Sequence, residues 1–241
     1  MNELRTAIVT GASGGIGRAI VAELLRLGLS VHALALPDGN LAAMAGLDGV
    51  TVHPIDVRDT AALAAIVAGI EVDVLVNNAG VIGALEPLHG YSAAIADAII
   101  DINLRAAIHT TLAALPGMVA RDRGHIVFTG SIAATRPTAN TAVYSATKAA
   151  LSAFADGLRL DLFGHAIRVT VIAPGRVETN LYDQALGSHE AAQAKLYSGG
   201  LAMRPEDVAT LVGVALTMPN HVDVTRLEVL PTAQVYGGSQ I

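Results

Sequence analysis

A tyrosine and a lysine four positions apart are the residues most able to do chemistry. Tyr144 and Lys148 lie in the run YSATK, and if this run is helical their side chains share one face. A free tyrosine has a pKa of about 10 and exchanges protons poorly at neutral pH. A neighbouring ammonium would lower that pKa, so the pair predicts a general acid/base. Ser131 ends the apolar run HIVFTGS and can offer its hydroxyl to the same substrate oxygen.

A glycine-rich segment near the N-terminus predicts a dinucleotide site. The segment TAIVTGASGGIGRAIVAELLRLG has the pattern of a buried strand, a turn and an amphipathic helix. Gly11, Gly15 and Gly17 occupy the turn, where glycine permits positive φ and close approach of the backbone to a pyrophosphate. The helix N-terminus offers unpaired N–H groups to the phosphates. A dinucleotide would be the redox partner that proton transfer at Tyr144 requires.

These clusters and four further motifs resemble, in order, those of the compact short-chain dehydrogenases/reductases. TGASGGIG is similar to the cofactor turn, IDV (55–57) to the adenine-contacting turn, NNAG (77–80) to the segment after the fourth strand, and PGRVET (174–179) to the loop over the nicotinamide. The resemblance implies a catalytic set of Asn103, Ser131, Tyr144 and Lys148. The cofactor-binding residues that it implies are Gly11, Ser13, Gly15, Ile16, Gly17, Asp56, Val57, Asn78, Gly80, Tyr144, Lys148, Pro174, Gly175, Val177 and Thr179.

The resemblance also implies a role for each catalytic side chain. Tyr144 would remove the alcohol proton as hydride leaves for the nicotinamide, and would protonate the alkoxide in reduction. Ser131 would hold and polarise the substrate oxygen. Lys148 would also bind the nicotinamide ribose, and Asn103 would hold a water that links Lys148 to solvent. The expected activity is an NAD(P)-dependent interconversion of a secondary alcohol and a carbonyl.

Strand-like and helical patterns alternate along the chain with no linker and no repeat. Strands are predicted at 7–9, 31–36, 50–55, 74–76, 125–129, 168–172 and 227–230, and helices at 15–27, from 41, and at 61–67, 92–121, 144–163 and 206–218. Such alternation predicts an α/β, three-layer doubly wound (Rossmann) fold over residues 1–241 as one domain. The resemblance implies a seven-stranded parallel sheet in the order 3-2-1-4-5-6-7.

Composition excludes several classes of function. The chain has 241 residues, a formal net charge of −6 and no cysteine, which argues against nucleic-acid binding, disulfides and thiol catalysis. Its eight histidines form no H-x-x-x-H pair, so we expect no metal site. The charge-free stretches 106–120 and 208–222 are shorter than the ~18 residues of a membrane span. The first strand begins too early for a signal peptide, so we expect a cytoplasmic protein that does not bind a membrane.

Cofactor preference depends on the end of the second strand. An acidic residue there bonds the ribose 2′-hydroxyl of NAD, whereas an arginine accepts the 2′-phosphate of NADP. In VHALALPDGN, Ala35 and Leu36 stand at the usual positions and Asp38 is the nearest carboxylate. No Lys or Arg occurs there or inside the glycine turn, so the sequence favours NAD. A preference for NADP would need an arginine from elsewhere, such as Arg18 or Arg58.

The substrate is predicted to be a small polyol or hydroxy acid. The C-terminal part is similar to the branch that contains 3-hydroxy acid (serine-type) and ribitol dehydrogenases, and it lacks the glycine-rich ending of many ketoacyl carrier-protein reductases, which remain an alternative. A hydroxy acid needs a cation for its carboxylate, and Arg136 and Arg176 are the candidates. A polyol needs neutral hydrogen-bonding groups; the candidates are Thr135, Asn140, Thr141, Glu86 and Glu178.

The segment 180–200 contains Tyr182, His189 and Tyr197 and is predicted to form a lid over the substrate. A surface helix and loop without a catalytic part is the alternative. The helices that carry Asn103 and Tyr144 have faces of small residues (Ala106, Ala107 and Ala113; Ala149, Ala150 and Ala153). By resemblance these helices pair between subunits in a homotetramer. A non-catalytic nucleotide-sensing or scaffold protein is a further alternative, although such relatives commonly lose the catalytic residues.

Overall fold

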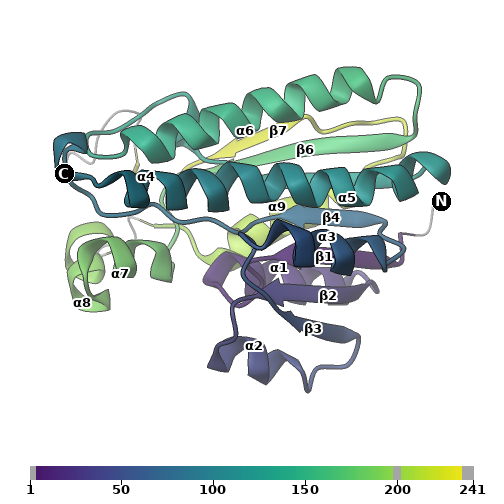
Figure 1. The fold of residues 1–241 in the computed structure, drawn as a ribbon, viewed down its shortest axis with the longest axis horizontal. Helices are drawn as coiled ribbons and strands as arrows, with labels where there is room; N and C mark the ends of the chain where they lie inside the picture. The colour runs from purple at the N-terminus through teal and green to yellow at the C-terminus, as the bar shows by residue number, and fades with distance from the viewer. Residues whose placement is uncertain (1–3, 198–201, 235–241) are drawn as a thin grey trace.

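A seven-stranded parallel sheet forms the centre of the molecule (Figure 1). The structure, a computed structural model, describes residues 4–197 and 202–234. The strand order is β3-β2-β1-β4-β5-β6-β7, which confirms the predicted topology. The strands are β1 (Thr6–Thr10), β2 (Ser30–Ala35), β3 (Val50–Pro54), β4 (Val74–Asn77), β5 (Gly124–Thr129), β6 (Ile167–Pro174) and β7 (Arg226–Val229).

Helices cover both faces of this sheet, as the alternating pattern predicts. They are α1 (Gly15–Arg26), α2 (Gly39–Met44), α3 (Thr60–Ala68), α4 (Ala93–Ile100), α5 (Ala106–Ala120), α6 (Ala142–Asp161), α7 (Asn180–Leu186), α8 (His189–Ala192) and α9 (Pro205–Thr217). Short 3-10 turns occur at Leu88–Gly90 (η1) and Ile132–Ala134 (η3), and π-helical turns at Asp101–Arg105 (η2) and Gln193–Tyr197 (η4). Helices α7 and α8 lie together at one end of the sheet (Figure 1).

Two aliphatic cores hold the three layers together. On one face α1, α2 and α9 pack on the sheet, with Ile20 of α1 and Val212 of α9 fully buried. On the other face α3, α5 and α6 cover it, and Leu63 of α3, Met118 of α5 and Leu151 of α6 lie in one cluster. Burial on both faces explains why the strands are continuous aliphatic runs rather than alternating ones. The two cores fix the strand ends from which the site is built.

The carboxyl ends of β1, β4 and β5 are joined by one asparagine. Asn78 donates from Nδ2 to the carbonyl oxygens of Thr10, at 3.1 Å, and Gly11, at 3.2 Å. Its Oδ1 accepts from the Thr129 hydroxyl at 3.2 Å. Because β1 is paired with both β2 and β4, the chain changes direction at this point in the sheet. Ligands of such sheets bind at this switch point, outside the carboxyl ends of the strands.

The predicted helix 92–121 is continuous but contains an irregular turn. Helices α4 and α5 are joined by the π-helical turn η2, and Ala93–Ala120 together are long and apolar enough to cross a membrane by length and composition. The charge-free stretch 106–120 therefore underestimates the length of the apolar helix. Such a helix is weak evidence for a membrane span, since α5 packs on the sheet face beside α3. A helix that covers a buried sheet has the same composition.

Candidate active site

A cleft of about 350 Å³ opens at the carboxyl ends of the strands. Every residue predicted to bind the cofactor lines it, and so does Ser131. Asn103 does not line the cleft, although it is buried nearby. Additional lining residues that the sequence did not single out include Asn40, Val81, Thr129 and Gly130. Segments far apart in the chain therefore meet at a single concave site.

The glycine turn between β1 and α1 is closed against its own backbone. Gly11 has φ of +64°, and a Cβ atom there would lie 2.8 Å from the Ala79 Cα. A Cβ at Gly17 would lie 2.1 Å from the Gly11 carbonyl oxygen and 2.9 Å from the Ala12 Cα. Helix α1 begins at Gly15 with its N–H groups at the cleft. The turn thus presents backbone rather than side chains, as close contact with a pyrophosphate requires.

Asp38 and Asp56 follow strands β2 and β3 at the end of the cleft where the adenosine of a dinucleotide would bind, here called the adenosine end. Both carboxylates already have partners. Asp38 caps helix α2 by accepting from the Leu41 N–H at 2.7 Å, and accepts from the Ser13 hydroxyl at 2.8 Å. Asp56 accepts from Nε of Arg58 at 2.9 Å. The hydrogen bonds from Arg58 hold the pKa of Asp56 below its usual range. Both carboxylates therefore order the protein locally.

A second arginine reaches the same end of the cleft from helix α1. Arg18 donates from Nη1 to the Asn40 side-chain oxygen at 3.2 Å. Asn40 lines the cleft, at the N-terminal end of α2. Arg18 and Arg58 are the two arginines that the sequence offered as partners for a 2′-phosphate. The structure brings both to the adenosine end.

Tyr144 is buried at the opposite end of the cleft, on helix α6. Burial raises the pKa of Tyr144, the nearby Tyr182 phenol adds to this effect, and a hydrogen bond with Ser131 opposes it. The net shift of this pKa is therefore upward, contrary to the lowering expected from Lys148, because desolvation disfavours the phenolate. Ser131 lies at the end of the loop after β5, where its Oγ also accepts from the Ala133 N–H at 3.1 Å. The predicted Ser–Tyr pair is nevertheless in place.

Lys148 is buried one helical turn from Tyr144, but its amine is bonded elsewhere. Its Nζ donates to the Thr129 carbonyl oxygen at 2.8 Å and lies 5.8 Å from the centroid of the Tyr144 ring. Burial lowers the pKa of Lys148 to about 8. The amine thus keeps its charge at neutral pH while no carboxylate in the described part of the chain pairs with it. A bound group with hydroxyl oxygens would find a donor here.

Asn103 holds the loop after β4 to helix α6. In the π-helical turn η2, its Oδ1 accepts from the Val81 N–H at 2.8 Å, and its Nδ2 donates to the Val81 oxygen at 2.8 Å and to the Thr147 hydroxyl at 3.1 Å. Both ends of the Asn103 side-chain amide are engaged in these bonds to the protein. The resemblance instead implied that Asn103 holds a water that links Lys148 to solvent. The contacts make Asn103 a positioning residue for Gly80, whose backbone lies between Asn103 and Lys148. The role of Asn103 in proton transfer stays a prediction.

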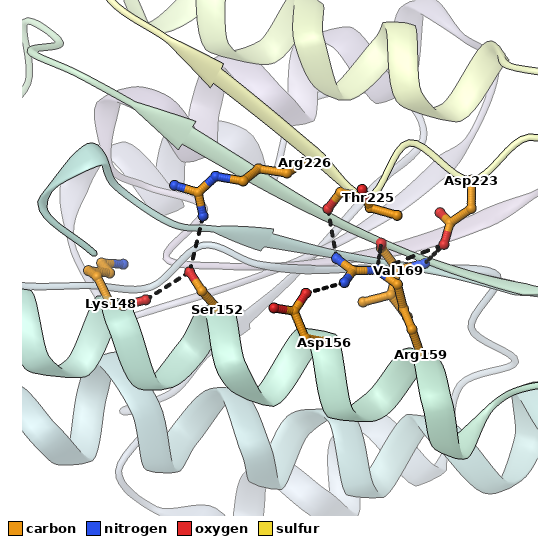
Figure 2. Close-up of polar contacts among 8 residues, drawn as sticks. All are labelled: Lys148, Ser152, Asp156, Arg159, Val169, Asp223, Thr225 and Arg226. Carbon is orange, nitrogen blue, oxygen red and sulfur yellow. Dashed lines mark hydrogen bonds and ion pairs between the residues drawn. The ribbon is translucent and has the colours of Figure 1, made fainter. Parts of the chain in front are cut away.

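Helix α6 is fastened to the last two strands by polar contacts along its length (Figure 2). Arg159 donates from Nη2 to the Thr225 oxygen at 2.7 Å. Closer to the site, Arg226 donates from Nη1 to Ser152 Oγ at 3.4 Å, and this hydroxyl donates to the Lys148 carbonyl oxygen at 3.1 Å. These contacts fix the helix that carries the tyrosine and the lysine relative to β6 and β7.

The lid segment packs directly on the tyrosine. Leu181 and Tyr182 of α7 form an apolar cluster with Tyr144 and Ile82. At the other end of the segment the Tyr197 hydroxyl donates to the Thr179 oxygen at 2.9 Å. The segment therefore covers the catalytic end of the cleft, although residues 198–200 of the predicted lid lie outside the described residues. Its movement as a lid stays a prediction.

The candidate substrate-binding residues differ in their positions. Arg136 is exposed, whereas Arg176 is buried and donates from Nη1 to the Leu196 oxygen at 3.2 Å. Of the polyol candidates, Thr141 is buried and bonded to Ser145, and Glu86 is half-buried; Thr135, Asn140 and Glu178 are exposed.

In residues 4–197 and 202–234 there is no group of three or more His, Asp or Glu side chains that could hold a metal ion.

A Rossmann sheet with a dinucleotide cleft and a Ser–Tyr–Lys set defines an alcohol oxidoreductase. The family model for short chain dehydrogenase matches residues 5–189, and the chain belongs to the short-chain dehydrogenase/reductase family. It is an NAD(P)-dependent enzyme that acts on CH–OH groups.

Relatives and solved structures cover nearly the whole chain. A short-chain type dehydrogenase/reductase of Sinorhizobium fredii, y4eK, is 48% identical over 100% of this chain and 97% of its own. The NADP-dependent 3-hydroxy acid dehydrogenase YdfG of Escherichia coli K12 is 36% identical over 97% and 98%. The closed form of serine dehydrogenase complexed with NADP+ superposes with a TM-score of 0.92, at 36% identity and 98% coverage of both chains. The relatives whose names give a cofactor give NADP, which does not support the predicted preference for NAD.

Proposed function

We propose that this chain interconverts the secondary alcohol of a small hydroxy acid and the corresponding carbonyl with NADP(H). The observation that carries the proposal is that Tyr144, Ser131 and Lys148 line the same cleft as a bare glycine turn. A Cβ atom at Gly17 would clash with the backbone of the turn itself, so the turn can be this tight only with glycine there. A tight turn that exposes its backbone to the cleft fits a dinucleotide phosphate. When bound there, the nicotinamide would donate or accept the hydride.

Tyr144 is proposed to exchange the proton of the substrate oxygen. Because burial raises its pKa, the phenol is protonated at neutral pH and is ready to donate to an alkoxide during reduction. The Ser131 hydroxyl faces the phenol and would hold the same oxygen in place. In oxidation the phenol must lose its proton, and the Lys148 ammonium 5.8 Å from its ring would favour the resulting negative charge. Lys148 would also bind the ribose next to the nicotinamide.

NADP is proposed as the cofactor on two grounds. YdfG and the serine dehydrogenase structure are named with NADP. In this chain Asp38 is occupied as the cap of α2 and by Ser13, so its carboxylate is not a free acceptor for both ribose hydroxyls. Arg18, next to Asn40 at the same end, would then pair with the 2′-phosphate.

A hydroxy acid fits the catalytic end better than a polyol. The cover over Tyr144 is apolar, with Ile82, Leu85 and Leu181 in one cluster. Several of the neutral groups that a polyol would use are exposed or already bonded. YdfG is named for 3-hydroxy acids. A 3-ketoacyl carrier-protein-type reduction is the second candidate for the same machinery, but no observation in the site favours it.

One experiment tests the reaction and the cofactor together. Purified wild-type protein is assayed with NAD+ and NADP+ against 3-hydroxy acids, polyols and simple secondary alcohols, and the variants Arg18→Gln and Asp38→Asn are assayed in parallel. We expect the highest kcat/KM for hydroxy acids with NADP+, and a loss of about 10- to 100-fold with NADP+ but not NAD+ in Arg18→Gln. A preference for NAD+ that disappears in Asp38→Asn would contradict the choice of cofactor, and polyols as the best substrates would contradict the substrate class.

The homotetramer and the cytoplasmic location also remain proposals. Ile100 and Leu112 are 39% and 59% exposed on the long apolar helix, and Ala149 and Ala153 of α6 are exposed too, whereas Ala106 and Ala107 of α5 are buried within the chain itself. An apolar surface of this kind is typical of a subunit interface. These helices would pair between protomers, away from the cleft.

A further inference from the structure

A second phenol faces the catalytic tyrosine from the lid. Tyr182 lies on helix α7, lines the cleft and packs in the apolar cluster of Tyr144 and Ile82. Its ring also contacts that of Tyr197 edge-on, with centroids 6.3 Å apart, which fixes its direction. No hydrogen bond of the Tyr182 hydroxyl occurs within the part of the chain that the structure describes. Among residues 4–197 and 202–234, this O–H group therefore has no acceptor, and it is a donor available in the cleft.

The buried side chain of an arginine, Arg176, is bonded to the segment that contacts this phenol. Arg176, two residues after the end of β6, is only 8% exposed. Its backbone N–H donates to Gln234 Oε1 at 2.8 Å, and its Nη1 donates to the Leu196 oxygen at 3.2 Å. Within residues 4–197 and 202–234 no carboxylate lies within ion-pair distance of its guanidinium. A guanidinium has five N–H donors, and a buried charge without a counter-ion is costly.

The two groups interact with each other and with the catalytic phenol. Burial raises the pKa of Tyr182, and the positive charge of Arg176 opposes that shift. The Tyr182 phenol in turn contributes to the raised pKa of Tyr144. Geometry supports this: Arg176 bonds to the Leu196 oxygen, the adjoining Tyr197 contacts the Tyr182 ring, and Tyr182 packs with Tyr144. Tyr182 lines the cleft and Arg176 does not. At neutral pH the Tyr182 phenol is protonated and can donate a hydrogen bond.

We propose that Arg176 and Tyr182 together recognise the carboxylate of the substrate, and so make the enzyme selective for hydroxy acids over neutral alcohols. This inference rests on the proposed function and names the groups that would read its substrate class. The Tyr182 hydroxyl donates to a carboxylate oxygen in the cleft, and the guanidinium behind it compensates the negative charge. The substrate anion would supply the counter-ion that Arg176 lacks in the protein. Because Tyr182 belongs to the lid segment, an acidic substrate would also hold that segment against Tyr144.

The test compares an acid with its uncharged isostere. Oxidation of 3-hydroxybutyrate and of 3-hydroxybutyramide by NADP+ is measured for the wild type and for Arg176→Leu, Arg176→Lys, Tyr182→Phe and Arg136→Leu. Arg176→Leu should lower kcat/KM for the acid by about 10- to 100-fold, through KM, because a hydrogen-bonded charge pair is lost. Tyr182→Phe should lower it by about 3- to 10-fold, since one hydrogen bond is removed. Arg176→Lys should retain part of the preference.

The amide and the exposed arginine serve as controls. Arg176→Leu and Tyr182→Phe should lose clearly less on the amide than on the acid, and Arg136→Leu should behave like the wild type on both substrates. Equal losses on acid and amide in Arg176→Leu and in Tyr182→Phe would overturn the proposal, because they would show a structural role only. A selective loss on the acid in Arg136→Leu alone would assign the carboxylate to the other arginine and overturn it as well.

A second measurement separates this inference from the proposed function. Butyrate has the carboxylate but no hydroxyl, so it should compete with a neutral alcohol substrate in the wild type and not in Arg176→Leu. If the wild type does not oxidise hydroxy acids but butyrate competes in this way, the carboxylate site is supported and the proposed substrate fails. If hydroxy acids are oxidised and neither variant is selective, the proposed function is supported and the carboxylate site is refuted.

Discussion

The two ends of the cleft are built from different parts of the protein. At the dinucleotide end the contacts come from backbone, and the required feature is the absence of side chains at Gly11 and Gly17. At the catalytic end the working groups are buried polar side chains, and both Tyr144 and Lys148 have pKa values shifted by burial. The first end is a steric arrangement and the second an electrostatic one.

This difference determines how each end responds to substitution. A backbone cradle fails when any atom is added, because a Cβ has no room and the neighbouring backbone cannot give way. A buried polar site fails when a functional group is removed, yet the fold itself can gain stability because a desolvated charge is lost. We therefore expect opposite relations between stability and activity at the two ends.

The largest effect is expected at the catalytic end, from Tyr144→Phe. This change removes one hydroxyl and leaves the ring in its apolar cluster. Loss of a general acid/base should lower kcat by about 10²- to 10⁴-fold, measured by initial rates of NADP(H) turnover. Binding of NADPH, followed by fluorescence titration, should stay the same. Retained turnover would remove Tyr144 from the mechanism, and a parallel loss of cofactor binding would show that its hydroxyl acts by holding the cofactor rather than by transferring a proton.

A smaller effect, in stability as well as affinity, is expected at the dinucleotide end from Gly17→Ala. The added Cβ would lie 2.1 Å from the Gly11 carbonyl oxygen, so the turn must open. We expect a loss of about 3 kcal/mol or more in the free energy of unfolding, measured by urea denaturation, together with weaker NADPH binding.

Gly14→Ala is the matched control in the same turn. Its Cβ would lie 3.5 Å from the Gly11 carbonyl oxygen, which is an ordinary contact. Gly14 already has extended backbone angles that alanine adopts. Its cost should stay below about 1 kcal/mol. Equal destabilisation by the two alanines would refute the steric account of the turn.

The same distinction explains what the sequence could predict. Glycine spacing reports backbone geometry, and aliphatic runs report strands buried on both faces, so the strands and the glycine turn could be predicted from the residues themselves. The strand order, which is confirmed, and the cofactor-binding residues, which line the cleft, were implied by the resemblance to the family. Electrostatics depends on what surrounds a group in space. The i, i+4 spacing placed Lys148 beside Tyr144 but did not reveal that its amine bonds to Thr129 or that burial outweighs its charge.

Local irregularity and long-range contacts were also beyond the sequence pattern. Helical periodicity predicted one helix over 92–121, whereas Asn103 sits in a π-helical turn that directs its amide to Val81. The contact of Tyr182 with the Tyr144 cluster depends on how α7 packs after β6. The cofactor preference inferred from Ala35 to Asp38 considered a single strand end and did not include the capping of α2 by Asp38.

Lys148→Met offers a finer test of the electrostatic end. The chain has a second lysine, the exposed Lys195, whose replacement by methionine is the matched control. Burial lowers the pKa of Lys148 to about 8, from 10.5 in the unfolded chain. Folding therefore favours the neutral amine. The contribution of this lysine to the free energy of unfolding is greatest above pH 10.5, falls as the pH drops from 10.5 to 8, and is constant below that range.

Lys148→Met should consequently be more stable than the wild type at neutral pH, by about 1–2 kcal/mol, and nearly inactive. The difference in the free energy of unfolding should shrink as the pH rises from 8 to 10.5, because over that range the lysine is already neutral in the folded protein but still binds a proton in the unfolded chain. Lys195→Met should show no such pH-dependent difference. A variant that is less stable than the wild type at neutral pH would mean that the bond to Thr129 outweighs the desolvation of the amine, and that the catalytic end stabilises the fold as the glycine turn does.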